Sequence, residues 1–265
     1  MDDDSGVGSS VPVEPMPVTP DRDPVWMKMI GVIVSPDPVL TGITEHPVRH
    51  AHWLIPLIVY CVVSVASIQA LTLTPGLRQE FRETIDEVLQ PGLDEQMKKG
   101  TLTQDQAEWL HAFITPGTTQ FLTAQGIGTI IGSFAALFAL AMIFWQLGKS
   151  AMSNRAPYMK VVELVGFTFV IAAIERCTTT GLMIATQSIY ATPGLGLLVL
   201  DSAPESLWFL TLSRFNLFTF WELGFISRGL SILLNRDFPK VLVLVGALWL
   251  LWSIVTVLPF FNAAG

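Results

Sequence analysis

The sequence is poor in charged residues and in cysteine, and each shortage excludes a class of protein. Charged residues make up 14% of the 265-residue chain, whereas soluble domains carry about 25%. The net charge is −7, and no basic cluster is present that could neutralise phosphates, which argues against nucleic acid as a partner. Cys61 and Cys177 lie in apolar segments without metal or redox spacing, so we interpret them as small buried residues.

Motifs of hydrolytic or nucleotide-dependent catalysis are also missing. The chain has no nucleophile elbow, no HExxH, no P-loop and no GxGxxG placed after a strand. We therefore expect a protein that is not an enzyme and that holds no cofactor. His46 and His50 have the spacing of two ligands on one helical turn, but Pro47 interrupts that turn and no second pair follows. We predict no metal site.

The first 24 residues lack the apolar core of a signal peptide. They are acidic and rich in proline, with few apolar side chains to offset the entropy lost on ordering. We expect residues 1–24 to form a disordered tail, and the first membrane helix to act as an uncleaved insertion signal.

What the sequence has in abundance is long apolar segments. Each offers about 20 mostly apolar residues or more, which as a helix rising ~1.5 Å per residue is enough to cross a hydrocarbon core of about 30 Å. The segments are residues 53–73, 121–147, 161–189, 208–234 and 241–261. We therefore predict an all-α membrane protein, in which residues 53–265 form a bundle of five transmembrane helices.

Basic residues in the short loops predict how this bundle is oriented, because positively charged loops stay in the cytoplasm. They precede the first segment and occupy the loops after the second and fourth, while the loop after the third segment has none. The residues concerned are Arg22, Lys28, Arg49, Lys149, Arg155, Lys160, Arg236 and Lys240. We expect a multi-pass protein of the cytoplasmic (inner) membrane, with its N-terminus in the cytoplasm and its C-terminus outside.

A short apolar run precedes the first segment. It lies within residues 25–52 and is broken by Pro36 and Pro38, so it is too short to cross a bilayer. We interpret residues 25–52 as an interfacial segment on the cytoplasmic face.

The loop between the first two segments, residues 74–120, carries two amphipathic helical patterns. The first ends at Pro91-Gly92, and the second begins at Thr103, where Gln106 completes a capping box. We predict a small extracytoplasmic insert of two short helices packed on the bundle. A lid that binds a partner is the alternative.

Charged residues inside the third and fourth segments need a structural or functional reason, since each costs about 2.5–3.5 kcal/mol at the bilayer centre on insertion scales. Glu175 and Arg176 lie in the third segment, and Arg214 and Glu222 in the fourth. Because these segments would run antiparallel, we expect Arg176 to pair with Glu222, and Glu175 with Arg214. Such a network is either a static pin between helices or the lining of a path for a proton, ion or solute.

A stripe of small residues lies in the second segment. Gly128, Gly132 and Ala136 recur every four residues, a spacing that lets another helix approach closely. We expect this stripe to pack within the bundle, with a dimer face as the alternative.

Three sequence patterns follow one another along the chain. The first is SPDPVLTGITEHPVRHAHWLIPL, and the second is LTQDQAEWL in the outer insert. The third is FNLFTFWELGFISRGL, with Phe218, Trp221 and Gly229, followed by a short basic loop and the last apolar segment. In this order, over about residues 30–261, the chain resembles the bacterial branch of the Yip family, the Ypt/Rab-interacting five-span membrane proteins.

This resemblance implies a topology and a general role, and it assigns no catalytic residue. Eukaryotic members act in vesicle traffic and bind Rab-type GTPases, but their cytoplasmic DLxGP-type motif does not occur here, which argues against GTPase binding. Some bacterial members are found with ABC-type export systems. We therefore expect a scaffold or accessory subunit whose partners are the bilayer and other membrane proteins, such as an ABC-type transporter or a second copy. A small transporter or channel using the Glu/Arg network is the alternative.

Overall fold

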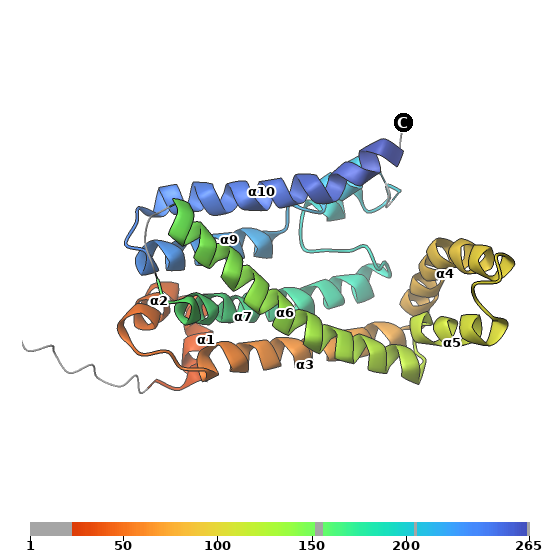
Figure 1. Ribbon diagram of the computed structural model, residues 1–265, viewed down its shortest axis with the longest axis horizontal. Helices are drawn as coiled ribbons and strands as arrows, with labels where there is room; N and C mark the ends of the chain where they lie inside the picture. Colours follow the sequence, from red (N-terminus) through yellow and green to blue (C-terminus); the bar gives the residue numbers. More distant parts are fainter. Residues whose placement is uncertain (1–22, 152–155, 204–205, 264–265) are drawn as a thin grey trace, which may run out of the picture.

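The computed structural model describes residues 23–151, 156–203 and 206–263, and these form helices joined by short connections, with no strand among them (Figure 1). The predicted disordered tail lies almost wholly outside the described residues. The helices are α1 (Val25–Val34), α2 (Pro36–Glu45), α3 (Ala51–Leu73), α4 (Pro75–Lys98), α5 (Gln104–Ile114), α6 (Thr119–Ala151), α7 (Tyr158–Thr186), the 3-10 helix η1 (Leu195–Val199), α8 (Leu207–Leu212), α9 (Leu217–Leu233) and α10 (Phe238–Ala263).

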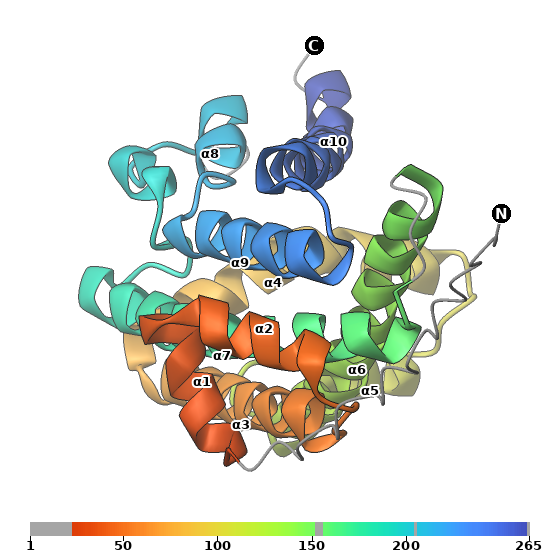
Figure 2. The ribbon, with the colours of Figure 1, turned by 90° about the vertical axis from the view of Figure 1, so that its left-hand side faces the viewer.

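The centre of the bundle is α7, which is surrounded by the other long helices. Seen along the bundle, α3, α6 and α9 lie around α7, and α1 and α2 cover its first turns (Figure 2). Residues 160–171 of α7 are all buried. The first half of α7 is therefore enclosed by protein on every side, although it carries the charged residues Lys160 and Glu163.

Two glycines allow neighbouring helices to approach α7 closely. A Cβ on Gly166 would lie 2.4 Å from the Cα of Trp53, so α3 packs backbone against backbone there. A Cβ on Gly229 of α9 would lie 2.2 Å from Cδ1 of Leu164 and 3.0 Å from Cδ2 of Leu40. Gly229 thus lets α9 reach both α7 and α2.

In the described part of the chain, three helices are long and apolar enough to cross a membrane: α3 over Ala51–Leu73, α6 over Thr119–Ser150 and α10 over Phe238–Val257. Large apolar side chains are exposed along all three, for example Val62, Ile131 and Val243. Such a surface is expected where lipid, rather than water, covers the protein. The chain is therefore an all-helical membrane protein, as the sequence predicted.

The third predicted segment is a 29-residue helix, α7, but it carries Lys160, Glu163, Glu175 and Arg176. The fourth predicted segment, residues 208–234, is not one continuous helix. It is divided into α8 and the 17-residue α9, and the chain between them is irregular.

The prediction of a continuous fourth helix is thus wrong, and the reason is the connection that precedes it. The backbone N–H of Leu195 donates to the carbonyl of Phe215 at 3.0 Å, and Gly194 forms a β-bridge with Asn216. The Asn216 side chain caps α9 by accepting the N–H of Phe218 at 2.9 Å. The backbone groups that lack a helical partner at the break are therefore hydrogen-bonded by other protein groups. This is the condition under which irregular backbone is tolerated at membrane depth.

Residues 74–120 form two helices, α4 and α5, at one end of the bundle (Figure 1). The capping box at Thr103 and Gln106 is confirmed, since both of its hydrogen bonds are present. The predicted end of the first helix at Pro91 is wrong, because α4 continues to Lys98. Pro91 cannot donate to the carbonyl of Glu87, but both residues are exposed, so this carbonyl can turn to solvent.

We predict that Gly166→Ala destabilises the bundle by about 1–3 kcal/mol or more, because the new methyl group would overlap the α3 backbone. The measurement is the thermal unfolding midpoint of the purified protein in detergent. Gly132→Ala is the matched control, since a Cβ there has no atom within 4 Å. Equal midpoints for the two variants would show that α3 and α7 are not in close contact.

Candidate functional site

The four charged residues predicted to form an intramembrane network do not pair as expected. Among the described residues, no ion pair joins Arg176 to Glu222 or Glu175 to Arg214. Instead, Glu175 accepts a hydrogen bond from the Asn216 side chain amide, and the Glu222 carboxyl group lies close enough to Glu175 to interact with it electrostatically. Glu175 thus contacts the break between α8 and α9 through Asn216, and Glu222 lies further along α9.

The two arginines form no ion pair with these carboxyl groups, although the charge of Arg176 acts on the neighbouring Glu175 carboxyl group, and they lie apart from each other. Arg176 lines a cavity formed with α3, α4 and α6, and Arg214 lines a separate one beside α10. Consecutive residues on a helix point about 100° apart, so Glu175 and Arg176 cannot both face α9. Arg214 lies in the irregular chain before α9, so its direction does not follow from the helical spacing of Glu222.

A second charged cluster, which the sequence analysis missed, lies at the start of α7. The Glu163 side chain is fully buried, with 0% of the residue exposed, and His52 and Lys160 beside it are also buried. Glu163 Oε1 accepts the backbone N–H of Arg49 at 2.7 Å and lies 3.1 Å from His52 Nδ1, while Oε2 lies 3.3 Å from Lys160 Nζ. Two helices therefore meet at one buried carboxylate.

Lys160 extends this cluster to α2. Its ammonium donates to the backbone carbonyls of Ile43 and His46, where α2 ends. A buried carboxylate is tolerated only when it is paired and hydrogen-bonded, and removing one partner of such a pair is strongly destabilising. The cluster therefore fixes the chain between α2 and α3 against α7. The signal that could have revealed it is the motif EHPVRHAH, which places His52 three residues after Arg49.

An ion pair also joins α2 to α9, on the exposed side of the same end. Arg228 Nε and Nη2 donate to the two carboxylate oxygens of Asp37 at 2.9 and 3.0 Å. These hydrogen bonds and the charge of Arg228 hold the pKa of Asp37 below its ordinary value. The two parallel hydrogen bonds fix the orientation of α9 relative to α2 as well as the distance between these helices.

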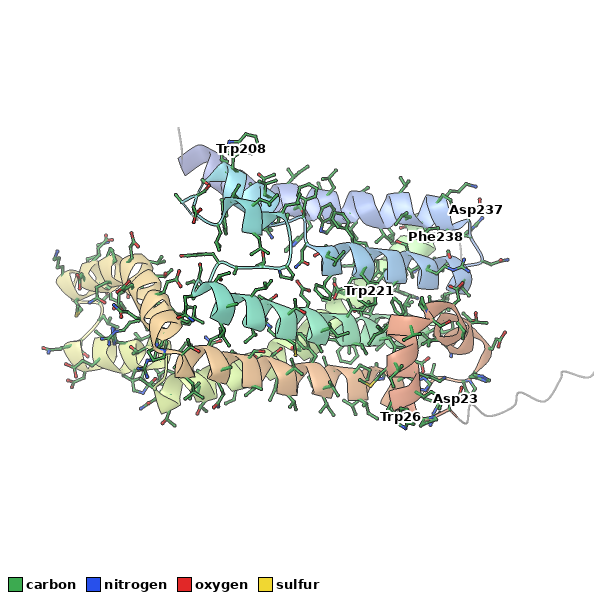
Figure 3. All side chains as sticks on the ribbon, turned by 180° about the vertical axis from the view of Figure 1, so that it is seen from behind. Asp23, Trp26, Trp208, Trp221, Asp237 and Phe238 are labelled. Carbon is green, nitrogen blue, oxygen red and sulfur yellow. The ribbon has the colours of Figure 1, made fainter. Side chains whose placement is uncertain are left out.

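The residues of the FNLFTFWELGFISRGL pattern serve packing. Phe218 and Trp221 are stacked, with ring centroids 6.3 Å apart, and Trp221 lies between α9 and α7 (Figure 3). Phe218 is buried, and Gly229 gives α9 its close contact with α7, as described above.

The small-residue stripe on α6 faces away from the bundle. Gly128, Gly132 and Ala136 are exposed, and a Cβ on either glycine would have no heavy atom within 4 Å. The expectation that the stripe packs within the bundle is therefore wrong. It forms part of the outer surface of α6, where another helix could approach.

Tryptophans mark the two ends of the bundle. Trp26 on α1 and Trp208 on α8 are largely exposed, and they lie at opposite ends (Figure 3). Exposed tryptophan is enriched where a membrane meets water. Over the described part of the chain, no three His, Cys, Asp or Glu side chains are grouped so that they could hold a metal ion.

Comparison with known protein families identifies a match. The family described as the Yip1 domain matches residues 30–258, which is most of the chain. Neither a curated protein nor a solved structure is significantly similar to the chain.

We predict that Glu163→Gln lowers the free energy of unfolding by about 3–5 kcal/mol, because it leaves the Lys160 ammonium buried without its opposite charge. Denaturant unfolding in detergent, followed by circular dichroism, measures the change. The double variant Glu163→Gln/Lys160→Met should lose less than the sum of the two single losses.

The control is Asp237→Asn, which removes one partner of the exposed Asp237–Lys240 pair and should leave stability unchanged. Additive losses in the double variant would show that Glu163 and Lys160 do not stabilise each other.

Proposed function

The chain belongs to the family of Yip1-domain proteins, and from this premise we propose that it crosses the membrane five times and serves as a non-enzymatic scaffold or accessory subunit of a membrane complex. Three crossings are α3, α6 and α10, whose length and composition suffice by themselves. The other two would be α7, and α8 together with α9.

Burial supports the assignment of the two less apolar crossings. The first half of α7 is covered by protein on all sides, so Lys160 and Glu163 need not face lipid. At the break before α9, backbone groups form hydrogen bonds with the loop that leads into η1. These bonds satisfy backbone N–H and C=O groups that the interrupted helix would otherwise leave without partners.

We assign the end that carries α1 and α2 to the cytoplasm, and the C-terminus and the α4–α5 insert to the outside of the inner membrane. The loop between α9 and α10, which carries Arg236, and the first turn of α10, which carries Lys240, lie at the same end as α1 (Figure 3). The positive-inside rule then places this end in the cytoplasm.

The observation that carries the scaffold role is the outward-facing stripe on α6. In a membrane, helices associate through small residues that allow close backbone contact, and Gly128, Gly132 and Ala136 present such a surface without a partner helix from the described bundle. The partner would be another membrane protein, such as an ABC-type transporter, or a second copy of this chain.

Purification of the tagged protein in mild detergent, read by mass spectrometry, should yield a stoichiometric membrane partner or a homodimer. We predict that Gly132→Leu loses this partner without a change in thermal midpoint, because leucine would keep the two backbones apart. Gly246→Leu is the matched control, since it fills an equally open glycine on α10. Retention of the partner by the Gly132 variant would exclude the stripe as its binding surface.

The transporter alternative is supported by a different observation, the pair of carboxyl groups at a helix break. Glu175 is hydrogen-bonded to Asn216 where α8 and α9 are interrupted, and Glu222 on α9 interacts with Glu175 electrostatically. Membrane transporters place ion sites at discontinuous helices.

For this alternative we predict that Glu222→Gln abolishes proton flux into protein-containing vesicles, measured with a pH-sensitive dye, while the protein remains folded. The control Asp237→Asn should keep full flux, because Asp237 lies in the exposed loop between α9 and α10. If the unaltered protein gives no flux above that of empty vesicles, the transporter role is excluded for protons.

A further inference from the structure

A cavity of about 330 Å³ lies where the end of α3, the start of α4, the start of α6 and the second half of α7 come together. Its volume falls within the ~300–1,000 Å³ typical of ligand sites. Most of its wall is apolar, and includes Leu71, Leu77, Phe121 and Met183. Among these, Leu77 and Phe121 are almost completely buried.

Two arginines line this apolar cavity, and no acidic residue lines it with them. They are Arg78, on the first turn of α4, and Arg176, on α7, and both are exposed. Arginine remains charged at any pH that proteins experience. Within the part of the chain that the structure describes, neither guanidinium takes part in an ion pair or a side-chain hydrogen bond.

The acidic residues nearest to these arginines point elsewhere. Glu175, which precedes Arg176, accepts the hydrogen bond from Asn216 on the α9 side of α7. Glu80 accepts the backbone N–H of Ile189 at 3.0 Å. Glu83 and Asp86 line a separate hollow between α4 and the connection from α5 to α6, and Arg78 lines this hollow as well. The cavity thus combines an apolar wall with two positive charges that lack a counter-charge inside it.

We propose that this cavity binds an anionic lipid, with its acyl chain against the apolar wall and its phosphate between Arg78 and Arg176. A positive charge in an apolar site at membrane depth is costly without a partner, and arginine binds phosphate oxygens through several parallel hydrogen bonds. Gln125 and Tyr190 also line the cavity and supply polar groups for a headgroup. This site is independent of the partner surface on α6.

A lipid fits this cavity better than a free anion because most of the cavity wall is apolar. Apolar side chains beside the lining residues are exposed on three helices, Leu73 on α3, Ile127 on α6 and Ile184 on α7, so an acyl chain can reach the cavity from the bilayer without crossing water. A soluble anion would gain nothing from Leu71, Phe121 or Met183.

The test uses the full-length protein in detergent and native mass spectrometry with two lipids of identical acyl chains, phosphatidylglycerol and phosphatidylcholine. We expect at least a tenfold preference for phosphatidylglycerol. Arg78→Gln or Arg176→Gln should each weaken its binding about tenfold, as expected when one charged hydrogen-bond donor is lost, and the double variant should bind both lipids equally.

Arg82→Gln is the matched control. Arg82 lies one turn further along α4, is exposed and pairs with Asp86, and it lies outside the cavity. Its loss should leave the preference unchanged. Circular dichroism and thermal midpoints verify the fold, and Arg78→Gln at the end of the bundle remains informative if an Arg176 variant does not fold.

Three results would overturn the proposal. One is equal binding of the two lipids by the unaltered protein, and another is an equal effect of Arg82→Gln and Arg176→Gln. The third is displacement of bound phosphatidylglycerol by millimolar inorganic phosphate, which would identify a site for small anions instead of a lipid site.

Discussion

The rest of the bundle depends on the buried contact between Glu163 and the start of α3. The carboxylate accepts the backbone N–H of Arg49 and lies beside His52 and Lys160. Gly166 lies almost one turn further along α7, on the side that faces α3, where it removes the side chain that would keep the two backbones apart. The hydrogen-bonded Glu163 carboxylate and Gly166 thus lie on the side of α7 that faces α3. Together they let α3 cover the buried charged residues of α7 and exclude lipid from them.

The opposite side of α7 is organised by α9. Gly229 lets α9 approach α7 near Leu164. Arg228 holds α9 to α2 through its ion pair with Asp37. Asn216 caps the start of α9 beside Glu175. Both sides therefore use the same two means, a glycine for close approach and a polar contact for position. This explains why α7 carries more charge than its neighbours and is nevertheless the most enclosed helix.

The apolar segments and the capping residues could be predicted from the sequence, whereas the rotation of each helix about its own axis could not. The apolar runs located α3, α6 and α10, and Thr103 with Gln106 located the start of α5, because each is a local property of the chain. The partners of Glu175 and Arg176 could not be predicted in the same way, since they depend on which helix each side chain faces. The break at Asn216 was hidden for a similar reason, because it is stabilised by hydrogen bonds from the residues around Gly194, a different stretch of chain. The burial of Glu163 depends on a helix start more than a hundred residues earlier.

The four charged residues of α7 also bear on how the protein enters the membrane during synthesis. A helix with Lys160, Glu163, Glu175 and Arg176 would partition poorly from the translocon into lipid by itself, because each charge at membrane depth is unfavourable. The partners that bury its first turns, α2 and α3, are made earlier in the chain, so they are already present when α7 emerges. In the proposed five-span topology, insertion of α7 would be a docking step onto a helical surface that has already formed, and the order of the segments along the chain would be part of the folding mechanism.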